Sequence, residues 1–302
     1  MTLTAAILLI TSALAHAGWN HFSKKDHPST ASFLLANLFG TLLVVPLLIQ
    51  GRSQVMEIIQ QLWPLLLLTG FFQALYFFGL AYAYKKGELS VAYPLARSLP
   101  ALMVTTVVFL IGRGEAIGSA VLLGIALIIA GGFLIPLRSF RDFSLQKYKS
   151  IAVVAALVAA AGTAGYSLTD DFALSTIRGL RPVTFRENFL LAFYYIGLQG
   201  MTTIFWQGLV VVPNWRERRI FRQQIAHPAS SIIKGAGILI TYALVLISMG
   251  YVTNVSYVVA FRQLSIPIGL IFGILFLKEL ICGPKITAVV LLFAGVVLVG
   301  LG

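Results

Sequence analysis

The chain has 302 residues, of which 59% are hydrophobic and only 11% are charged. A soluble globular domain carries about 25% charged residues, so the composition excludes an ordinary water-soluble fold. The net charge of +12 could suggest a nucleic-acid partner, but the lysines and arginines lie in short segments between long apolar runs, as in membrane proteins. We therefore expect a membrane protein with no nucleic-acid partner. The single cysteine, Cys282, excludes a disulfide framework and a cysteine-rich metal site.

Ten apolar runs follow one another, each close to the ~20 residues that a helix needs to cross the hydrocarbon core. We expect spans at residues 3–22, 31–50, 62–83, 89–111, 116–136, 151–170, 188–212, 229–249, 254–277 and 284–301. The first resembles a signal peptide at Ala13-Leu14-Ala15, but no lysine or arginine precedes it, so we expect a retained helix. The longest polar stretches, 137–150, 171–187 and 213–228, are too short for a soluble domain. The predicted fold class is an all-α membrane protein with ten transmembrane helices.

Two parts of the chain nearly repeat each other, which indicates a duplication. The matching positions are Arg97 and Arg262, Glu115 and Glu279, and Gly131 and Gly295. In the first and sixth spans, Ala17-Gly18-Trp19-Asn20 likewise resembles Ala164-Gly165-Tyr166-Ser167. We expect two five-helix units, at residues 1–140 and 150–302, and because five is odd they must enter the membrane from opposite sides. Inverted repeats of this kind place a binding site near the midplane, between the halves.

The distribution of basic residues predicts the orientation. Of the 22 lysines and arginines, 15 lie on one side of the predicted membrane, 5 lie on the other, and Arg97 and Arg262 lie within spans. By the positive-inside rule, the richer side is cytoplasmic and both termini face outward from the cell (inner or plasma) membrane.

Arg97 and Arg262 are the leading candidates for a binding site. Arg97 lies near the middle of the fourth span, where an arginine costs about 2.5–3.5 kcal/mol on insertion scales, and Arg262 takes the matching place in the ninth. Each guanidinium could bind a carboxylate or phosphate of a substrate through paired hydrogen bonds. Alternatively, each could bond to protein carboxylates or helix carbonyls and lock the halves together.

Other polar and aromatic residues could line the same site. Trp19 and Asn20 share one face of the first span with His16, and Tyr166 lies on the matching face of the sixth. Further candidates for substrate contact are Gln73, Tyr76, Tyr93, Tyr257 and Gln263. Pro94, Pro100 and Pro267 could create hinges or free carbonyls, and kinked packing alone would account for them equally well. Since Tyr93-Pro94 becomes Val258-Val259 in the second copy, the contacts with a substrate need not be symmetric.

His16 and Asp170 are the candidates for coupling to protons. His16 could titrate near neutral pH, although a lone histidine is more often hydrogen-bonded to a neighbouring helix. Asp170 could carry a coupling proton or pair with an arginine. Asp171 beside it favours another interpretation, in which both acids mark the solvated end of the span.

Three segments resemble a known family. The run Leu14-Ala15-His16-Ala17-Gly18-Trp19-Asn20, followed by Lys24-Lys25, is similar to the first helix of the EamA-like branch of the drug/metabolite transporter (DMT) superfamily. Residues 83–97 resemble the segment that joins helices 3 and 4 in that branch, and Glu115 and Glu279 match the glutamates that often end helices 4 and 9. The resemblance implies secondary transport of a small metabolite, often export, without an ATPase subunit. It does not indicate which metabolite.

Three functions remain open at this stage. We expect a secondary carrier for a small organic solute with an anionic group, driven by protons or by the gradient of the solute itself. An exporter of lipophilic cations would need an acid in its cavity, and only Asp170 could serve. A membrane enzyme or a lipid scaffold is the third alternative, but the sequence contains no Walker phosphate loop, zinc-binding HExxH motif or nucleophile elbow. We expect no catalytic activity, no cofactor and no metal.

Overall fold

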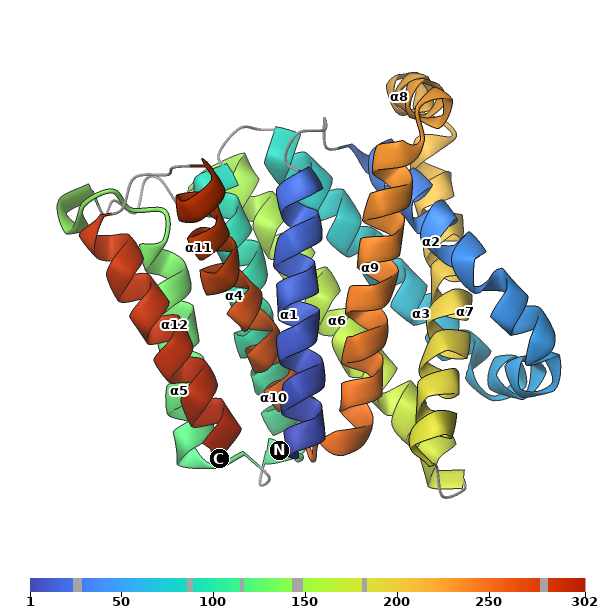
Figure 1. Cartoon of the computed structure of the whole chain (residues 1–302), viewed down its shortest axis with the longest axis horizontal. Coiled ribbons are helices and arrows are strands. Elements are labelled where there is room, and N and C mark those ends of the chain that lie inside the picture. Colours follow the sequence, from blue (N-terminus) through green and yellow to red (C-terminus); the bar gives the residue numbers. More distant parts are fainter. Residues whose placement is uncertain are drawn as a thin grey trace.

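The computed structural model describes residues 1–23, 29–85, 89–114, 117–142, 149–180, 184–277 and 282–301, and over these ranges the chain is helical and contains no strand. Figure 1 shows the arrangement. The longer helices are α1 (Leu3–Ser23), α2 (Thr30–Gln50), α3 (Arg52–Lys85), α4 (Leu89–Leu110), α5 (Ser119–Leu134), α6 (Ile151–Leu180), α7 (Phe185–Val211), α8 (Trp215–Ala226), α9 (Ala229–Ser248), α10 (Val255–Phe261), α11 (Ser265–Leu277) and α12 (Gly283–Leu301). Short 3-10 turns are η2 (Phe140–Asp142), η4 (Met249–Tyr251) and η5 (Arg262–Leu264).

The helices have the length and composition of membrane spans. Within the described residues, seven segments could cross a membrane: Thr30–Gln50, Arg52–Ala83, Ile151–Leu180, Phe185–Val211, Ala229–Tyr251, Val255–Phe272 and Gly283–Leu301. Three apolar helices are shorter over the same part of the chain: Leu3–Gly18, Pro94–Leu110 and Ser119–Leu134. Many large apolar side chains face outward, including Leu43, Trp63 and Phe205. Such a surface suits hydrocarbon, and the chain is a multi-pass membrane protein.

Two helices extend beyond the predicted spans. Helix α3 begins at Arg52 rather than 62, and α6 ends at Leu180 rather than 170. The extension of α6 is stable because its apolar stripe continues, with Ala173, Leu174 and Ile177 all buried. The segment 171–187 is therefore not a polar connection over most of its length.

The predicted polar stretch 213–228 contains helix α8. Its N-cap, Asn214, accepts hydrogen bonds from two backbone amides of the first turn. Ile220 and Phe221 pack beside a small buried cluster that includes Ala31 of α2 and Val211 of α7.

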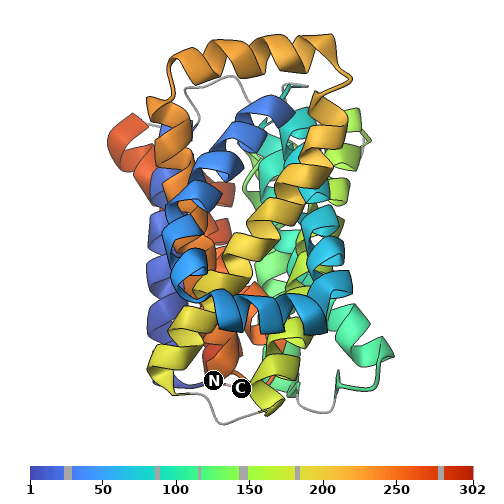
Figure 2. The ribbon, with the colours of Figure 1, turned by 90° about the vertical axis from the view of Figure 1, so that its right-hand side faces the viewer.

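Both termini lie at one end of the helix bundle, and α8 lies across the other end (Figures 1 and 2).

Glycines allow three pairs of helices to approach closely. At the crossing of α3 and α6, a Cβ added to Gly79 would lie 2.6 Å from the backbone nitrogen of Ala159, and one on Gly162 would lie 2.6 Å from that of Tyr76. The other pairs are Gly40 with Gly235 between α2 and α9, and Gly124 with Gly295 between α5 and α12. Helices in lipid associate largely through such close packing, because apolar burial alone drives little association there.

The ninth predicted span is interrupted at Arg262. Helix α10 ends at Phe261, the turn η5 follows, and α11 begins at Ser265. Pro267 explains the interruption, because proline has no N–H to bond with the carbonyl four residues earlier and its ring clashes with it. The break therefore places Arg262 and its carbonyl where the regular helical hydrogen-bond pattern fails.

Candidate functional site

The two predicted arginines approach each other inside the bundle. Arg97 on α4 is 4% exposed, and its Nη2 donates to the backbone oxygen of Arg262 at 3.2 Å and to the Ser265 hydroxyl at 2.7 Å. Its Nε is buried without a hydrogen-bond partner. Arg97 therefore contacts the broken segment of the ninth span through the backbone of its counterpart, and one of its donors remains unused.

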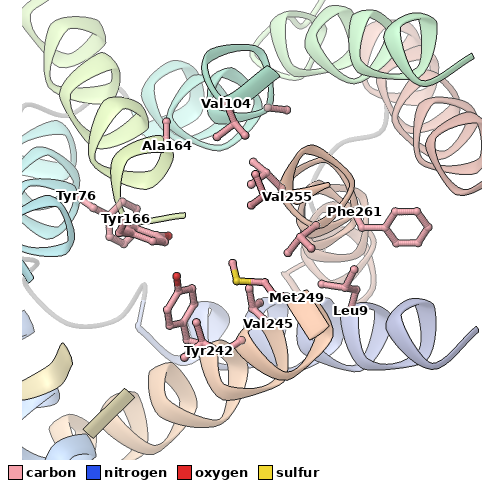
Figure 3. Close-up of a cluster of buried hydrophobic side chains, with 14 of the residues drawn as sticks. Leu9, Tyr76, Val104, Ala164, Tyr166, Tyr242, Val245, Met249, Val255 and Phe261 are labelled. Atoms are coloured by element: carbon pink, nitrogen blue, oxygen red, sulfur yellow. The ribbon is translucent and has the colours of Figure 1, made fainter. Parts of the chain in front are cut away.

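Arg262 lies between aromatic rings of the second half. Its Nη2 donates to the Tyr166 hydroxyl at 2.8 Å, and Nη1 lies 3.4 Å from the Ser167 hydroxyl. The guanidinium carbon lies 5.5 Å from the ring centroid of Tyr166 and 5.4 Å from that of Tyr242. These two rings meet edge-to-face with centroids 5.3 Å apart, and Figure 3 shows Tyr242 pointing toward Tyr166. Tyr166 and Ser167 are the residues that the repeat matches with Trp19 and Asn20.

Neither arginine pairs with an acid in the part of the chain that the structure describes. Their side-chain partners there are hydroxyls, a backbone carbonyl and aromatic rings. Cation–π contacts provide some stabilisation at a desolvated site, but they do not cancel a full charge. Two positive charges are therefore buried between the helices without a compensating carboxylate in contact.

Asp170 is fully buried, so the interpretation that it marks the solvated end of α6 is wrong. Its Oδ1 accepts hydrogen bonds from the hydroxyls of Thr69 on α3, at 2.5 Å, and Tyr195 on α7, at 2.8 Å. The Gln199 amide nitrogen lies 3.1 Å from Oδ1 and 2.9 Å from Oδ2, and Tyr242 on α9 donates its hydroxyl to Oδ2. We call Asp170 and these four donors the Asp170 cluster. It joins four helices.

A small pocket with a volume of ≈ 30 Å³ lies beside this cluster. Its walls come from α2, α3, α7 and α9: Asn37, Gly40, Thr41, Gln73, Ile196, Gly200, Gly235, Ile238, Leu239 and Tyr242. Gln73 accepts a hydrogen bond from Thr203 at 3.0 Å, and Asn37 donates to Gln207 at 3.0 Å. Asn37, Thr41, Gln73 and Tyr242 give the pocket a polar part, and its other six lining residues are apolar or glycine.

The remaining predicted site residues have different surroundings. His16 is 7% exposed on α1, within electrostatic range of Arg97 and Arg262. The ring centroid of Tyr76 lies 6.0 Å from that of Tyr166. Tyr257 is buried, and Gln263 is buried with its amide donating to the carbonyl of Val259 in its own segment. The side chains of Trp19, Asn20 and Tyr93, together with Glu115 and Glu279, lie outside the described residues.

Sequence reasoning missed most of the Asp170 cluster and most of the cavity wall. One signal was available, because Gln199, Thr203 and Gln207 recur every four residues within an apolar span and so lie on one face of α7. All three are buried, at 1% exposure or less. A buried polar stripe of this kind marks a face that lines a cavity or a hydrogen-bond network. In the described residues, no group of three His, Cys, Asp or Glu side chains could hold a metal ion.

Comparisons with known proteins agree with this architecture. Residues 3–137 match the EamA-like transporter family. The match covers a little under half of the chain, so the first half of the chain is similar to this family. The resemblance to the DMT superfamily is thereby confirmed, and its proteins are membrane transporters rather than enzymes.

Solved structures share the fold of this chain. A crystal structure described only as that of a protein has a TM-score of 0.69 over 100% of this chain and 98% of its own, at 16% identity. In all, 18 chains of solved structures match. The curated proteins searched contain no match. At 16% identity the structural likeness establishes the fold alone.

Proposed function

We propose that this EamA-like protein is a secondary carrier that moves a small anionic solute across the cell membrane by alternating access. Ten spans would form two inverted five-helix units, at residues 1–140 and 150–302. In this scheme α1 to α5 are spans one to five, α6, α7 and α9 are spans six to eight, the α10–η5–α11 segment is the ninth, and α12 is the tenth. The solute would bind between the units.

The pattern of helix contacts supports the inverted pair. When each span is replaced by its counterpart in the other unit, a contacting pair of helices becomes another contacting pair. The contact of α1 with α9 corresponds to that of α6 with α3, and the contact of α2 with α9 corresponds to that of α7 with α3. The contact of α4 with α6 likewise corresponds to that of α11 with α1. The contacts of α2 with α7 and of α5 with α12 map onto themselves. A two-fold relation between the halves produces this pattern, and rocking about it is a known route to alternating access.

The buried charges support an anionic solute. Arg97 and Arg262 have no acidic contact in the described residues, and Asp170 is the only carboxylate in the neighbouring cluster. A carboxylate or phosphate on the solute would supply the missing charge and occupy unused donors such as Arg97 Nε. The uncompensated guanidinium pair is the observation on which this proposal depends.

A cation exporter is less well supported. Asp170 could serve such a carrier only if its oxygens were free, but they already accept hydrogen bonds from Thr69, Tyr195, Gln199 and Tyr242. A lipophilic cation would also bind near two guanidinium groups, whose charge repels it. The driving force could be a proton gradient, through His16 or Asp170, or the gradient of the solute.

The orientation also belongs to the proposal. Helix α8 carries four arginines and one glutamate and lies at the end opposite both termini (Figure 1). By the positive-inside rule that end would be cytoplasmic and the termini would face outward.

A ligand screen tests the proposed function. Purified protein is heated with members of a metabolite library, since a ligand that binds the native state raises its apparent stability. We expect hits enriched in carboxylates and phosphates. The Arg262→Ala variant should bind them about 10- to 150-fold more weakly, because hydrogen bonds to charged groups contribute about 1.5–3 kcal/mol.

Uptake into vesicles is then measured for the best hit with Arg97→Ala, Arg262→Ala and, as a control, Arg186→Ala. Arg186 is an exposed arginine at the start of α7, so its removal should leave transport unchanged. Hits confined to cations or neutral compounds would contradict the proposal. So would full transport by both buried-arginine variants.

A further inference from the structure

Tyr242 connects three features of the interior. Its side chain lines the cavity, its hydroxyl donates to Asp170, and its ring lies 5.4 Å from the guanidinium carbon of Arg262. A change of charge at Asp170 therefore alters both the hydrogen bonding of the cavity wall and the electrostatic surroundings of Arg262.

Asp170 is placed to change charge, because it is a buried acid that contacts no basic group among the described residues. An ionised carboxylate only accepts hydrogen bonds, and each of its four partners donates. The titratable groups that face it are Tyr195 from α7 and Tyr242 from α9. Helix α3 supplies the hydroxyl of Thr69. Among the described residues, neither Arg97 of α4 nor Arg262 donates to Asp170, and the guanidinium carbon of Arg262 lies 5.4 Å from the ring centroid of Tyr242.

The cluster also contains an acceptor that a protonated Asp170 could use. The Oε1 atom of Gln199 is buried and has no hydrogen-bond partner, whereas its Nε2 points at the carboxylate. Rotation of this amide by half a turn would direct Oε1 toward Asp170. The new O–H could then donate to Oε1, so both protonation states can be hydrogen-bonded without moving a helix.

We propose that Asp170 is the coupling site for protons, and that Tyr242 makes a proton and an anionic solute bind cooperatively. This inference rests on the proposed anion transport. With Asp170 ionised, the Tyr242 hydroxyl is occupied and the negative charge offsets the positive potential of Arg262. With Asp170 protonated, that hydroxyl is free to donate into the cavity, and the charge of Arg262 is unopposed.

Thermodynamic linkage makes the effect reciprocal. If a proton strengthens anion binding, then the anion strengthens proton binding by the same factor, which is typically about 5- to 150-fold. The protein would bind the solute together with a proton and release both together. A proton gradient could then drive uptake of the solute.

Calorimetric titration between pH 5.5 and 8 tests this linkage with benzoate, citrate and inorganic phosphate as probes. Two buffers of different ionisation enthalpy report how many protons accompany binding. For a probe that binds, we expect the affinity to fall by roughly 5- to 150-fold as the pH rises, with up to about one proton taken up per anion. Infrared difference spectra should show a protonated carboxyl band that Asp170→Asn removes.

Three variants separate the linkage from anion binding. Asp170→Asn should bind the anion at its low-pH affinity throughout the range and take up no proton. Tyr242→Phe and Tyr195→Phe form a matched pair, since each removes one hydroxyl that donates to Asp170 but only Tyr242 lines the cavity. Tyr242→Phe should show a clearly smaller pH dependence of anion binding, because only the charge of Arg262 still responds to Asp170, and Tyr195→Phe should keep the full dependence with a shifted midpoint.

The possible failures are distinguishable. Binding of none of the probes at any pH would overturn the proposed anion transport and the linkage with it. Anion binding that is independent of pH in the unmodified protein, or equal pH dependence in Tyr242→Phe and Tyr195→Phe, would overturn the linkage alone. If Asp170→Asn does not fold, the comparison of Tyr242→Phe with Tyr195→Phe and the infrared titration of the unmodified protein still test the linkage.

Discussion

The crossing of α3 and α6 provides a sharp test of the packing. In the Gly79→Ala variant the new Cβ would lie 2.6 Å from the backbone nitrogen of Ala159 and 2.7 Å from the backbone oxygen of Ala155. Ordinary van der Waals contact begins at 3.4 Å, so α3 must move away by about 0.8 Å. Both obstructing atoms belong to the backbone of a helix and cannot rotate aside.

The expected loss of stability follows from two opposing terms. Overpacking of a close interface costs about 1–3 kcal/mol. Replacing glycine by alanine within a helix returns up to about 1 kcal/mol. The net effect should be a destabilisation of about 1–2 kcal/mol, and the apparent Tm should fall by a few degrees.

The measurement is thermal unfolding of the purified protein in detergent, followed by tryptophan fluorescence. Gly208→Ala is the matched control, because a Cβ at Gly208 of α7 meets no atom within 4 Å. This control should be neutral or slightly stabilising. If Gly79→Ala and Gly208→Ala unfold at the same temperature, the close contact of α3 with α6 is not as the structure has it.

Two further predictions concern the ends of the helices. Asn188→Ala should destabilise the protein by about 1–3 kcal/mol, because Asn188 accepts two hydrogen bonds from Arg178 and donates one to the carbonyl of Ile247. A thermal unfolding curve that the substitution leaves unchanged would contradict this prediction. In a Cys282→Ser background, Gln223→Cys places a thiol on the exposed face of α8. A membrane-impermeant maleimide added to intact cells should label it only after permeabilisation, and labelling beforehand would reverse the proposed orientation.

Much of the fold could be predicted because membrane helices are encoded locally. Each predicted span overlaps a helix, since a long apolar run in lipid must satisfy its own backbone hydrogen bonds. Helix α8 was missed for the same reason, because it is polar and depends on a cap at Asn214 and on contacts of Ile220 and Phe221 rather than on an apolar run.

The site could be predicted only in part. A buried arginine stands out in an apolar sequence whatever surrounds it, so the burial of Arg97 and Arg262 could be predicted, while their role as a binding site stays a prediction. The role of Asp170 depends on Thr69, Tyr195, Gln199 and Tyr242, which come from three other helices. No local pattern reports such partners, and the neighbouring Asp171 suggested a solvated end.

The break in the ninth span gives the two arginines unequal freedom to vary. Arg97 donates to the backbone oxygen at position 262, which every amino acid possesses, and to the hydroxyl of Ser265. Any residue could replace the Arg262 side chain without removing the backbone acceptor, provided that Pro267 still interrupts the helix. Related proteins could therefore change the side chain at position 262, whereas Arg97, Ser265 and Pro267 would have to be retained together.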